Sequence, residues 1–435
     1  MSGDAVLPLR GRVRVPGDKS ISHRLLLIGA LATGRTRGRG LNTGEDVRAT
    51  AACLRALGVE VAFDAGSGAA EIDGAGPGWP AEPTEVLDCG NSGTTMRLLL
   101  GMCAAVDGLS VLTGDASLRR RPMGRVSAPL RAMGARIDGR AGGELAPLAV
   151  RGGPLRAVSH RSPVASAQVK SALLLAGLAA EGVTEVSEPI RSRDHTERLL
   201  AAAGVELERA GTTVALHGPA RPGPLDLDVP GDLSSALYLI AAALVVPGSE
   251  LTIEHVGLNP TRTAVLGVLE AMGADLEVRV VGEAAGEPYG EVSSRSSALT
   301  AVSLGPDEVP LVIDELPLLA VLSALAEGRS EVRGAAELRV KESDRITTVV
   351  GGLRALGVEA HELDDGYVIE GPARLRGGEI SSHGDHRVAL AFAVAGLAAA
   401  GRVRVHGWQA AETSFPGFLD VLAEAQGRAA SGGKR

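Results

Sequence analysis

The feature that most constrains the fold of this chain is one segment pattern that occurs six times. Each copy opens with polar and basic residues, continues as an apolar helix and ends in glycine. The six copies begin near Ser20, Gly90, Ser166, Asp232, Asp314 and Asp385. Recurrence at this scale indicates repeated supersecondary units. The sequence therefore predicts a fold built by duplication, and the length of 435 residues favours two domains.

A second pattern, in which a helix end, a small turn and a short strand follow one another, comes after each of the first five copies. Two further strands of alternating apolar and polar residues, Gly11–Val15 and Leu225–Val229, both run into Pro-Gly-Asp. We interpret these two points as crossings between domains. Residues 1–16 and 230–435 are then one discontinuous domain and residues 17–229 an inserted one, with three repeats in each.

Composition excludes several classes of function. The formal charge of −8 and an aromatic content of 2% argue against binding of nucleic acid. The three cysteines have no spacing typical of metal ligands, and their odd number suggests reduced thiols in the cytoplasm. No segment has the pattern of a secretion signal or a membrane span. We expect a cytoplasmic protein without metal, cofactor or membrane partner.

The starts of the six helices are the candidate binding sites, because a helix N-terminus presents unpaired N–H groups and partial positive charge. N-capping explains most polar helix starts. It does not explain the cations found here, which the helix dipole disfavours in a first turn. These cations are Lys19, Arg24, Arg97, Lys170 and Arg387. Together with the backbone they predict sites for anions.

Three motifs in the first half of the chain fit this prediction. Pro16–Arg24 places two cations and two hydroxyls at a helix start, without the spacing of a nucleotide-binding P-loop. Gly90–Arg97 offers a flexible turn followed by hydroxyls and an arginine. Arg121 lies in a loop and is stiffened by the proline that follows it. A cap, an ordinary turn and a solvated charge run are the respective structural alternatives.

Further candidates lie in the third repeat and in the second half. Ser166–Lys170 and Arg193–Glu197 offer hydroxyl, amide and cationic groups suited to a phosphate, with His195 as either a core or a catalytic residue. In Leu338–Arg345, a lysine and an arginine four residues apart are expected to share a helical face, although a helix salt-bridge ladder has the same pattern. Ile313–Pro317 places carboxylates at a helix start after an apolar strand.

These residues favour acid–base chemistry. No Ser–His–Asp order occurs, and Cys89 has no evident base in its local sequence, so covalent catalysis is disfavoured. A site rich in lysine and arginine with a few acids suits the joining of two small anionic substrates.

Taken in order, these motifs, with Asp385–Arg387 and Thr413–Pro416, resemble those of the enolpyruvylshikimate-phosphate synthases. These enzymes join phosphoenolpyruvate to shikimate 3-phosphate, and the likeness covers nearly the whole chain. It implies an α/β fold described as a two-domain inside-out α/β barrel, the enolpyruvyl transferase fold. Each domain would have three repeated α/β units with helices inside and sheets outside, and the active site would lie in the cleft between the domains. A monomer without cofactors is the simplest expectation.

The resemblance also implies roles for individual residues. Shikimate 3-phosphate would be held by Lys19, Ser20, Arg24, Ser166, Gln168 and Arg193. Phosphoenolpyruvate would be held by Lys19, Gly93, Arg121, Gln168, Arg345 and Arg387. Other substrate-binding positions in the same motifs are Asn91, Thr94, Arg97, Ala167, Asp314, Lys341 and His386. The catalytic residues would be Asp314, Glu342, Lys19 and Lys341, with Asp314 beside the reacting 5-hydroxyl; which of them acts as acid or base in each step stays open.

Three positions distinguish this chain from relatives. Thr413 stands where some members have a lysine, so one phosphate contact is lost or supplied by another residue. Ala167 stands where some members have a serine. Gly93 is the position where alanine excludes the herbicide glyphosate in some relatives, so we expect glyphosate to compete with phosphoenolpyruvate here.

Two alternative functions are compatible with parts of this pattern. The enolpyruvyl transferase of cell-wall synthesis acts on a UDP-sugar, but it has a cysteine in the loop where this chain has Ala116 and Ser117. It also has Lys-Asn where this chain has Lys19 and Ser20. The other alternative is a catalytically silent anion-binding relative, and the retained acids and lysine argue against it.

Overall fold

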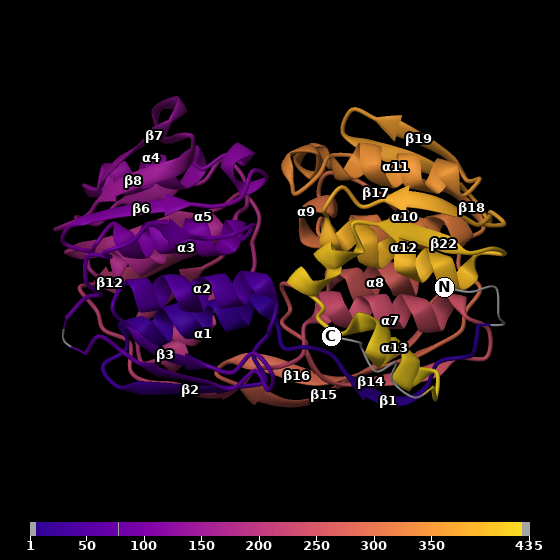
Figure 1. Cartoon of the computed structure of the whole chain (residues 1–435), viewed down its shortest axis with the longest axis horizontal. Helices are drawn as coiled ribbons and strands as arrows, with labels where there is room; N and C mark the ends of the chain where they lie inside the picture. The colour runs from indigo at the N-terminus through magenta and orange to yellow at the C-terminus, as the bar shows by residue number, and fades with distance from the viewer. Residues whose placement is uncertain (1–5, 77, 429–435) are drawn as a thin grey trace. The chain divides into compact units, whose positions relative to one another are not determined.

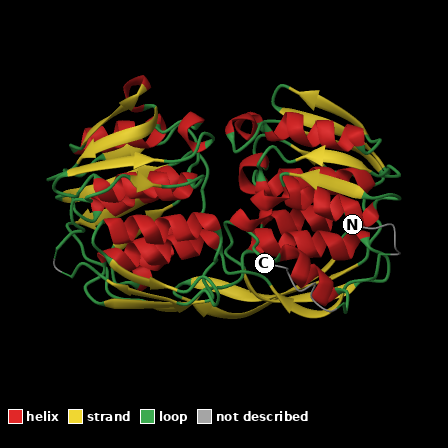
Figure 2. Cartoon of the chain, viewed as in Figure 1, coloured by secondary structure: helices red, strands yellow, loops and turns green. Residues whose placement is uncertain are grey.

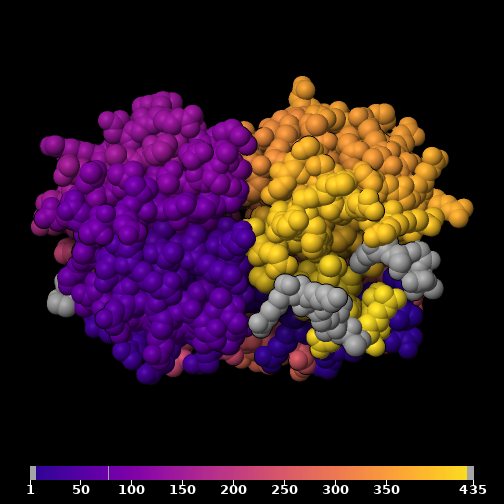
Figure 3. Space-filling model, in the orientation of Figure 1, coloured from indigo at the N-terminus to yellow at the C-terminus, as the bar shows by residue number. Residues whose placement is uncertain are grey.

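The computed structural model describes residues 6–76 and 78–428, which divide into two compact units. Unit 2 is made of Gly17–Val229 and Glu283–Glu287. Unit 1 is made of the described residues up to Pro16, of Pro230–Gly282, and of those from Pro288 onward. Figure 3 shows the discontinuity of unit 1, whose surface in this view combines yellow and orange C-terminal residues with indigo residues from the start of the chain.

Unit 2 contains three four-stranded sheets, with strand orders β13-β2-β4-β3, β5-β6-β8-β7 and β11-β12-β10-β9 (Figure 1). Its strands are β2 (Arg35–Arg39), β3 (Glu60–Phe63), β4 (Ala70–Asp73), β5 (Leu87–Asp88), β6 (Leu109–Thr113), β7 (Arg136–Arg140), β8 (Leu145–Arg151), β9 (Ser159–Arg161), β10 (Gly182–Ser187), β11 (Leu207–Ala210), β12 (Thr213–Gly218) and β13 (Asp226–Asp228). Its helices are α1 (Lys19–Leu31), α2 (Glu45–Ala56), α3 (Gly93–Cys103), α4 (Gly124–Met133), α5 (Ala167–Gly177) and α6 (His195–Ala202), with short 3-10 turns η1 (Leu118–Arg120) and η2 (Ala141–Gly143).

Unit 1 contains two four-stranded sheets, β1-β14-β16-β15 and β17-β18-β20-β19, and the two-stranded sheet β21-β22. Its strands are β1 (Arg10–Arg14), β14 (Glu250–Gly257), β15 (Asp275–Ala284), β16 (Glu287–Arg295), β17 (Ser303–Leu304), β18 (Gly328–Val332), β19 (Glu359–Leu363), β20 (Gly366–Gly371), β21 (Gly378–Ser381) and β22 (Val403–His406). Its helices are α7 (Leu233–Val245), α8 (Ala264–Ala271), α9 (Val309–Val312), α10 (Leu316–Leu325), α11 (Arg345–Ala355), α12 (His386–Ala398) and α13 (Phe418–Ala425), with 3-10 turns η3 (Ala336–Val340) and η4 (Trp408–Thr413).

One topology recurs through the described residues. Each four-stranded sheet has one parallel pair, namely β13–β2, β5–β6, β10–β9, β1–β14 or β17–β18. The sixth sheet retains only its parallel pair, β21–β22. This agrees with the sequence, in which the second pattern follows only the first five copies.

The first helix of each repeat is the central one. Every residue from Leu233 to Leu244 in α7 is buried, and α1, α3, α5, α10 and α12 are nearly as buried on all sides. A helix without a polar face belongs in an interior. Figure 2 accordingly shows, within each unit, red helices packed together and yellow strands on the outer side. Close packing is visible at Gly101 of α3, where an added Cβ would lie 2.1 Å from the carbonyl oxygen of Ala172 in α5.

Local sequence explains where most of these helices begin. The side chains of five N-cap residues, Asp18, Ser92, Ser166, Asp232 and Asp385, accept hydrogen bonds from backbone N–H groups of the first turn. Glu315 at the start of α10 makes no such bond, and Pro317 follows it in the first turn. The Pro-Gly-Asp sequences before α1 and α7 thus share a capping role, as expected for related halves.

Three sequence expectations are wrong in detail. Among the six central helices only α5 has glycine as its last residue, because the others end before the glycine of the following turn. The apolar residues before Asp314 form the short helix α9 instead of a strand. Glu283–Glu287, expected with residues 230–435, belongs to unit 2 because Glu287 is hydrogen-bonded to His195 and the carbonyl oxygen of Gly286 to Arg198. Among the described residues, no helix is long and apolar enough to cross a membrane.

Candidate active site

The start of α1 in unit 2 carries the first candidate cation. Asp18 caps the helix, so the next residue, Lys19, leaves the backbone at the helix N-terminus. The Nζ of Lys19 lies 2.9 Å from Oδ2 of Asp46, and 17% of the lysine side chain is exposed. Lys19 is therefore held by one carboxylate and still reaches solvent.

Arg24 lies one turn further along α1 and is buried. Its guanidinium donates to the hydroxyls of Thr196 at 2.6 Å and Ser171 at 2.8 Å, and to the carbonyl oxygen of Ser20 at 3.0 Å. Burial lowers the pKa of Arg24 to about 10, although the nearby Glu197 carboxylate acts in the opposite direction. The guanidinium therefore remains a cation at neutral pH, and these three hydrogen bonds all go to neutral oxygens.

Arg24 also brings two repeats together, because its partners come from α5 and α6. The charge of Arg193, in the loop before α6, contributes to lowering the pKa of Arg24, so these two predicted phosphate ligands are neighbours. Ser166, which caps α5, and Ala167, its first helical residue, complete the predicted group from the third repeat.

A second group forms at the start of α3. Gln168 of α5 accepts a hydrogen bond from Nη1 of Arg97 at 2.8 Å and donates one to the hydroxyl of Thr94 at 2.9 Å. Arg97 also donates to the carbonyl oxygen of Pro122 at 3.0 Å. These contacts fix the relative positions of α3, α5 and the arginine loop.

Gly93, the first residue of α3, lies against this group. A Cβ added there would lie 2.8 Å from Nη1 of Arg97 and 3.0 Å from Cζ of Arg121. Arg121 also donates to the carbonyl oxygen of Asn91 at 3.4 Å. The lack of a side chain at residue 93 therefore leaves room for two guanidinium groups beside a helix N-terminus, a suitable site for an anion.

His195 is a structural residue in this unit. Its Nδ1 lies 2.8 Å from Oε1 of Glu287, and both side chains are 1% exposed. A ring enclosed in this way contacts protein on all sides. Of the two interpretations left open by the sequence, the structure therefore supports a core histidine.

In unit 1 the candidate residues converge on Asp314. Its carboxylate lies 3.8 Å from Nζ of Lys341, 3.6 Å from Nη1 of Arg345 and 3.8 Å from Nη2 of Arg387. These cations come from the loop after η3, from the start of α11 and from the start of α12. Three positive side chains around one carboxylate supply a site for a second anion.

Arg345 connects the remaining acids. Its guanidinium lies 2.6 Å from Glu342 and 2.7 Å from the fully buried carboxylate of Asp385. Burial alone would lower the pKa of Arg345, but Asp385, Glu342 and Asp314 raise it above its usual value. Arg345 is therefore a permanent cation that fixes Glu342 close to Asp314.

Arg387 is held by a different set of contacts. Its Nη1 lies 3.4 Å from Oε1 of Glu315, and Ser234 of α7 donates to the same oxygen at 2.6 Å. Burial opposes its charge, but Asp314 and Glu315 are among the groups that raise the pKa of Arg387 above its usual value. His386 lies buried at the first position of α12.

One geometric prediction for this group is wrong. Lys341 and Arg345 do not share a helical face, because Lys341 ends η3 with extended backbone and α11 starts only at Arg345. Asp344 caps α11 and breaks the helical pattern between them. The two cations nevertheless both lie within 4 Å of Asp314. Tertiary folding, and not a shared helical face, brings them together.

Several polar partners in these groups were not predicted as functional. Asp46 pairs with Lys19, and Asp115 accepts a hydrogen bond from the amide of Asn91 at 2.6 Å. Glu188 accepts one from the backbone N–H of Ser166 at 2.7 Å. Each lies more than twenty residues from its partner in the sequence, so no local sequence pattern predicts the contact.

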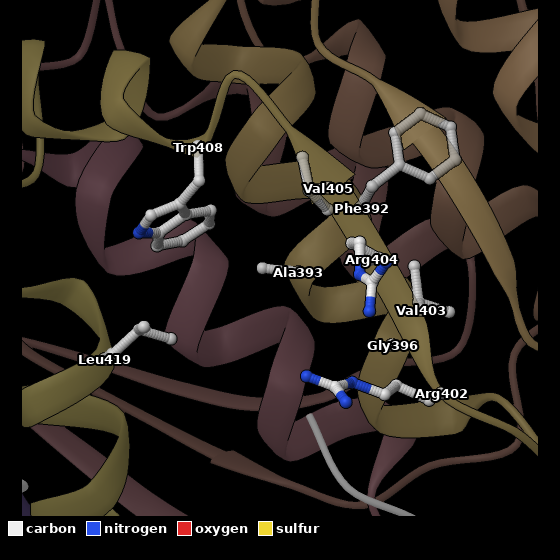
Figure 4. Close-up of a pocket in the computed structure, with 9 residues that line it drawn as sticks. All are labelled: Phe392, Ala393, Gly396, Arg402, Val403, Arg404, Val405, Trp408 and Leu419. Carbon is white, nitrogen blue, oxygen red and sulfur yellow. The ribbon is translucent and has the colours of Figure 1, made fainter.

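A separate cavity of about 170 Å³ in unit 1 contains none of the predicted site residues. Trp408, Leu419 and Phe392 contribute apolar walls, and Arg402 and Arg404 lie beside them (Figure 4). Both arginines are exposed, and Arg404 is paired with Glu379. The cavity is therefore distinct from the group around Asp314.

The comparison with protein families decides the identity of the chain. The model of the EPSP synthase family, described as 3-phosphoshikimate 1-carboxyvinyltransferase, matches residues 4–422. The chain belongs to the EPSP synthase family. It has the two-domain enolpyruvyl transferase fold of this family.

Individual relatives agree with this assignment. A 3-phosphoshikimate 1-carboxyvinyltransferase of Thermus thermophilus is 55% identical over 419 residues, which cover 95% of this chain and 96% of the relative. The enzyme of the same name from Synechococcus sp. RCC307 is 54% identical over 426 residues, covering 96% and 97%. The EPSP synthase structure from Acinetobacter baumannii has a TM-score of 0.86 at 43% identity and covers 98% of both chains.

A more distant structure shows only that the fold is shared. The enolpyruvyl transferase NikO from Streptomyces tendae has a TM-score of 0.78 at 20% identity, covering 97% of this chain and 96% of its own.

Proposed function

We propose that this EPSP synthase family member transfers the enolpyruvyl group of phosphoenolpyruvate to the 5-hydroxyl of shikimate 3-phosphate and releases phosphate. Such a reaction serves the shikimate pathway to chorismate and the aromatic amino acids. The family match over residues 4–422 is the observation that carries the proposal. The chemistry of the site residues supports it, since both substrates are anions and the candidate groups are cations at helix starts.

We assign acceptor binding to one part of unit 2. Lys19, Ser20, Arg24, Ser166, Gln168 and Arg193 would hold shikimate 3-phosphate. The proximity of Arg24 and Arg193, inferred from the effect of one charge on the other, supports this assignment because a phosphate dianion is best held by two cations.

Phosphoenolpyruvate would be held by a second set of residues. Lys19, Gly93, Arg121 and Gln168 are the contributors from unit 2, and Arg345 and Arg387 are those from unit 1. Asn91, Thr94, Arg97, Ala167, Lys341 and His386 would complete the substrate-binding set.

The chemical steps require proton transfer in both directions. The 5-hydroxyl gives up its proton as its oxygen adds to C2 of phosphoenolpyruvate and C3 gains a proton. The tetrahedral adduct then loses phosphate from C2 and a proton from C3, which restores the double bond. Asp314 and Glu342 would move the protons, with Lys341 and Lys19 close to the reacting groups. The cations around Asp314 would stabilise negative charge on the adduct and on the departing phosphate.

The experiment that tests this function measures phosphate release. The protein is given phosphoenolpyruvate with shikimate 3-phosphate and, separately, with UDP-N-acetylglucosamine. Release only with the shikimate compound is the expected result. Release only with the UDP-sugar would reverse the assignment, and a folded protein that releases phosphate with neither would be a silent anion-binding relative.

We also propose that the protein acts as a monomer in the cytoplasm. The three cysteines are all free and buried, which suits a reducing compartment. Light scattering on a sizing column tests the first point, with a mass near 44.3 kDa expected and a multiple of it contradicting the proposal.

A further inference from the structure

A buried ionic group in unit 2 has no role in the chemistry described above. Nζ of Lys170 in α5 lies 2.9 Å from Oε2 of Glu188 and 2.8 Å from Oε1 of Glu197 in α6. The three side chains are exposed by only 4%, 1% and 4%. Buried charges are rare and cost several kcal/mol each to desolvate, so a group of three needs an explanation.

The charge of this group also acts on Arg24, a proposed substrate ligand. One lysine and two glutamates leave one negative charge, and Glu197 acts on the cationic guanidinium of Arg24. Burial alone would lower the pKa of Lys170, but Glu197 and Glu188 raise it above its usual value. Lys170 therefore stays charged, and the group is a fixed ionic scaffold rather than a source of protons.

Both carboxylate oxygens of Glu188 accept hydrogen bonds from the segments that carry the proposed substrate ligands Ser166 and Arg193. Oε1 accepts the backbone N–H of Ser166 at 2.7 Å. Oε2 accepts the hydroxyl of Ser192 at 2.7 Å and its backbone N–H at 3.3 Å, while Lys170 donates to the carbonyl oxygen of Ser192 at 3.4 Å. Every hydrogen-bonding group of Ser192 is thus engaged, and Arg193 is the next residue.

The carboxylate therefore links two separate binding elements. Ser166 caps α5, and Arg193 lies in the loop that precedes α6. Gly93 and Arg121, which are proposed for phosphoenolpyruvate alone, make no hydrogen bond or ion pair with Glu188 within the described part of the chain, whereas Lys19 and Gln168 are proposed for both substrates. A disturbance at Glu188 should consequently weaken binding of shikimate 3-phosphate much more than binding of phosphoenolpyruvate.

We propose that Glu188 is a positioning residue for the acceptor substrate. Held by Lys170, it sets the spacing between Ser166 and Arg193, and this spacing fits the phosphate monoester of shikimate 3-phosphate. The inference rests on the proposed function. It identifies a residue that affects the affinity for the acceptor by holding binding residues in position, without contacting the acceptor itself.

The test compares Glu188→Ala and Glu188→Gln with the unchanged protein. Glu188→Ala should raise KM for shikimate 3-phosphate by about tenfold or more, because it leaves buried donors without a partner. KM for phosphoenolpyruvate should change by less than about threefold. Glu188→Gln keeps an oxygen for Ser166 and should recover part of the affinity. Titration calorimetry with shikimate 3-phosphate alone should show the same order of affinities.

Glu185→Ala is the matched control. Glu185 lies on β10, three residues before Glu188, and accepts a hydrogen bond from the hydroxyl of Ser159 at 2.8 Å. Neither KM should change in this variant. An unchanged acceptor KM in folded Glu188→Ala, or an equal rise in both KM values, would overturn the positioning role. If thermal melting shows that the alanine variant is unfolded, Glu188→Gln decides by the same comparison.

Failure of the proposed function is recognised separately. If the unchanged protein releases no phosphate with shikimate 3-phosphate, that function fails whatever the variants do. Binding of inorganic phosphate is then measured by calorimetry for the unchanged protein and Glu188→Ala. Weaker binding in the variant supports the positioning role, and equal or absent binding in both overturns it.

Discussion

The two units of this protein surround their candidate arginines with different partners. In unit 2, Arg24, Arg97 and Arg121 donate to hydroxyls, an amide and backbone carbonyl oxygens. Neutral partners orient a guanidinium without neutralising it. Unit 2 is therefore suited to binding anions, and we expect substitutions there to act mainly on KM.

In unit 1 the corresponding cations are paired with acids. Arg345 contacts Glu342 and Asp385, and Asp314 lies near three cations. Such pairing fixes carboxylates in place, and a fixed carboxylate can act in proton transfer. Substitutions of these acids should act mainly on kcat.

The strongest test is Asp314→Ala or Asp314→Asn. Either change removes a proposed proton-transfer group, so kcat should fall by about a thousandfold or more while the fold is retained. Steady-state phosphate release measures kcat and KM, and circular dichroism checks the fold.

Glu337→Gln is the control for this substitution. Glu337 and Asp314 lie at nearly equal distances from Nζ of Lys341, 3.7 and 3.8 Å, but 38% of the Glu337 side chain is exposed. Its loss should change kcat by less than about threefold. A near-normal rate for folded Asp314→Ala, or equal losses for both variants, would contradict the role of Asp314.

Asp385→Asn tests whether the acids of unit 1 also hold the unit together. Asp385 is 0% exposed and accepts hydrogen bonds from Arg345, Ser343 and the backbone N–H of Arg387. Removing its charge leaves a buried guanidinium partly unpaired, so the free energy of unfolding should fall by about 3 kcal/mol. Urea denaturation followed by circular dichroism gives this value.

The cap of the neighbouring helix provides the comparison. Asp344 begins α11 and pairs with Arg339, and 37% of its side chain is exposed. Asp344→Asn should lower the free energy of unfolding by less than about 1 kcal/mol. Equal losses for the two variants would mean that burial of Asp385 does not increase the contribution of its ion pair to the free energy of unfolding.

Gly93→Ala tests the binding role of unit 2. The new Cβ would displace the guanidinium groups of Arg97 and Arg121, which lie 2.8 and 3.0 Å away at their nearest atoms. KM for phosphoenolpyruvate should rise by about tenfold with a smaller change in kcat. Glyphosate should compete with phosphoenolpyruvate in the unchanged protein and inhibit the variant less.

Gly267→Ala in α8 is the matched control, because a Cβ there meets no atom within 4 Å. Its kinetics should be those of the unchanged protein. Full activity of the unchanged protein at high glyphosate would refute the competition, and an unaltered KM in Gly93→Ala would show that Gly93 does not set the space for the anion.

The sequence predicted what is local. The six central helices begin where the repeated pattern begins, because N-caps such as Asp18 and Ser92 are determined by neighbouring residues. The EPSP synthase family was identified from motifs at these starts, since short motifs remain readable in a single sequence. The reduced sixth repeat was visible for the same reason.

Contacts between distant segments could not be predicted in this way. Helix periodicity placed Lys341 and Arg345 on one face, whereas Asp344 interrupts the helix and Asp314 brings the two cations together instead. Glu188 lies 22 residues from Ser166 and belongs to no recognised motif. Packing of β10 against α5 places Glu188, the residue after β10, beside the start of α5, and packing is not encoded in any short pattern.

The smallest expected effect concerns His23, which lies inside the cation-rich region of unit 2. The residue is 0% exposed, and its Nδ1 lies 2.7 Å from the hydroxyl of Thr50. Burial lowers the pKa of His23 well below 6.5, and the charges of Lys19 and Arg24 lower it further. The folded protein therefore keeps a neutral imidazole at a pH where the unfolded chain binds a proton.

The sign of the pH effect follows from this difference. Below a pH of about 6.5 the unfolded state binds more protons, so the free energy of unfolding falls as the pH is lowered, by up to about 1.4 kcal/mol per pH unit. His23→Asn retains a neutral polar group and should flatten this dependence between about pH 6.5 and pH 5. Urea denaturation at several pH values measures it, with the exposed His217→Asn as control. Equal slopes for the unchanged protein and His23→Asn would mean that the unfolded chain gains no extra proton at this residue. A flatter slope would show that His23 stays neutral in the folded protein, as its burial and the nearby charges of Lys19 and Arg24 lead us to expect.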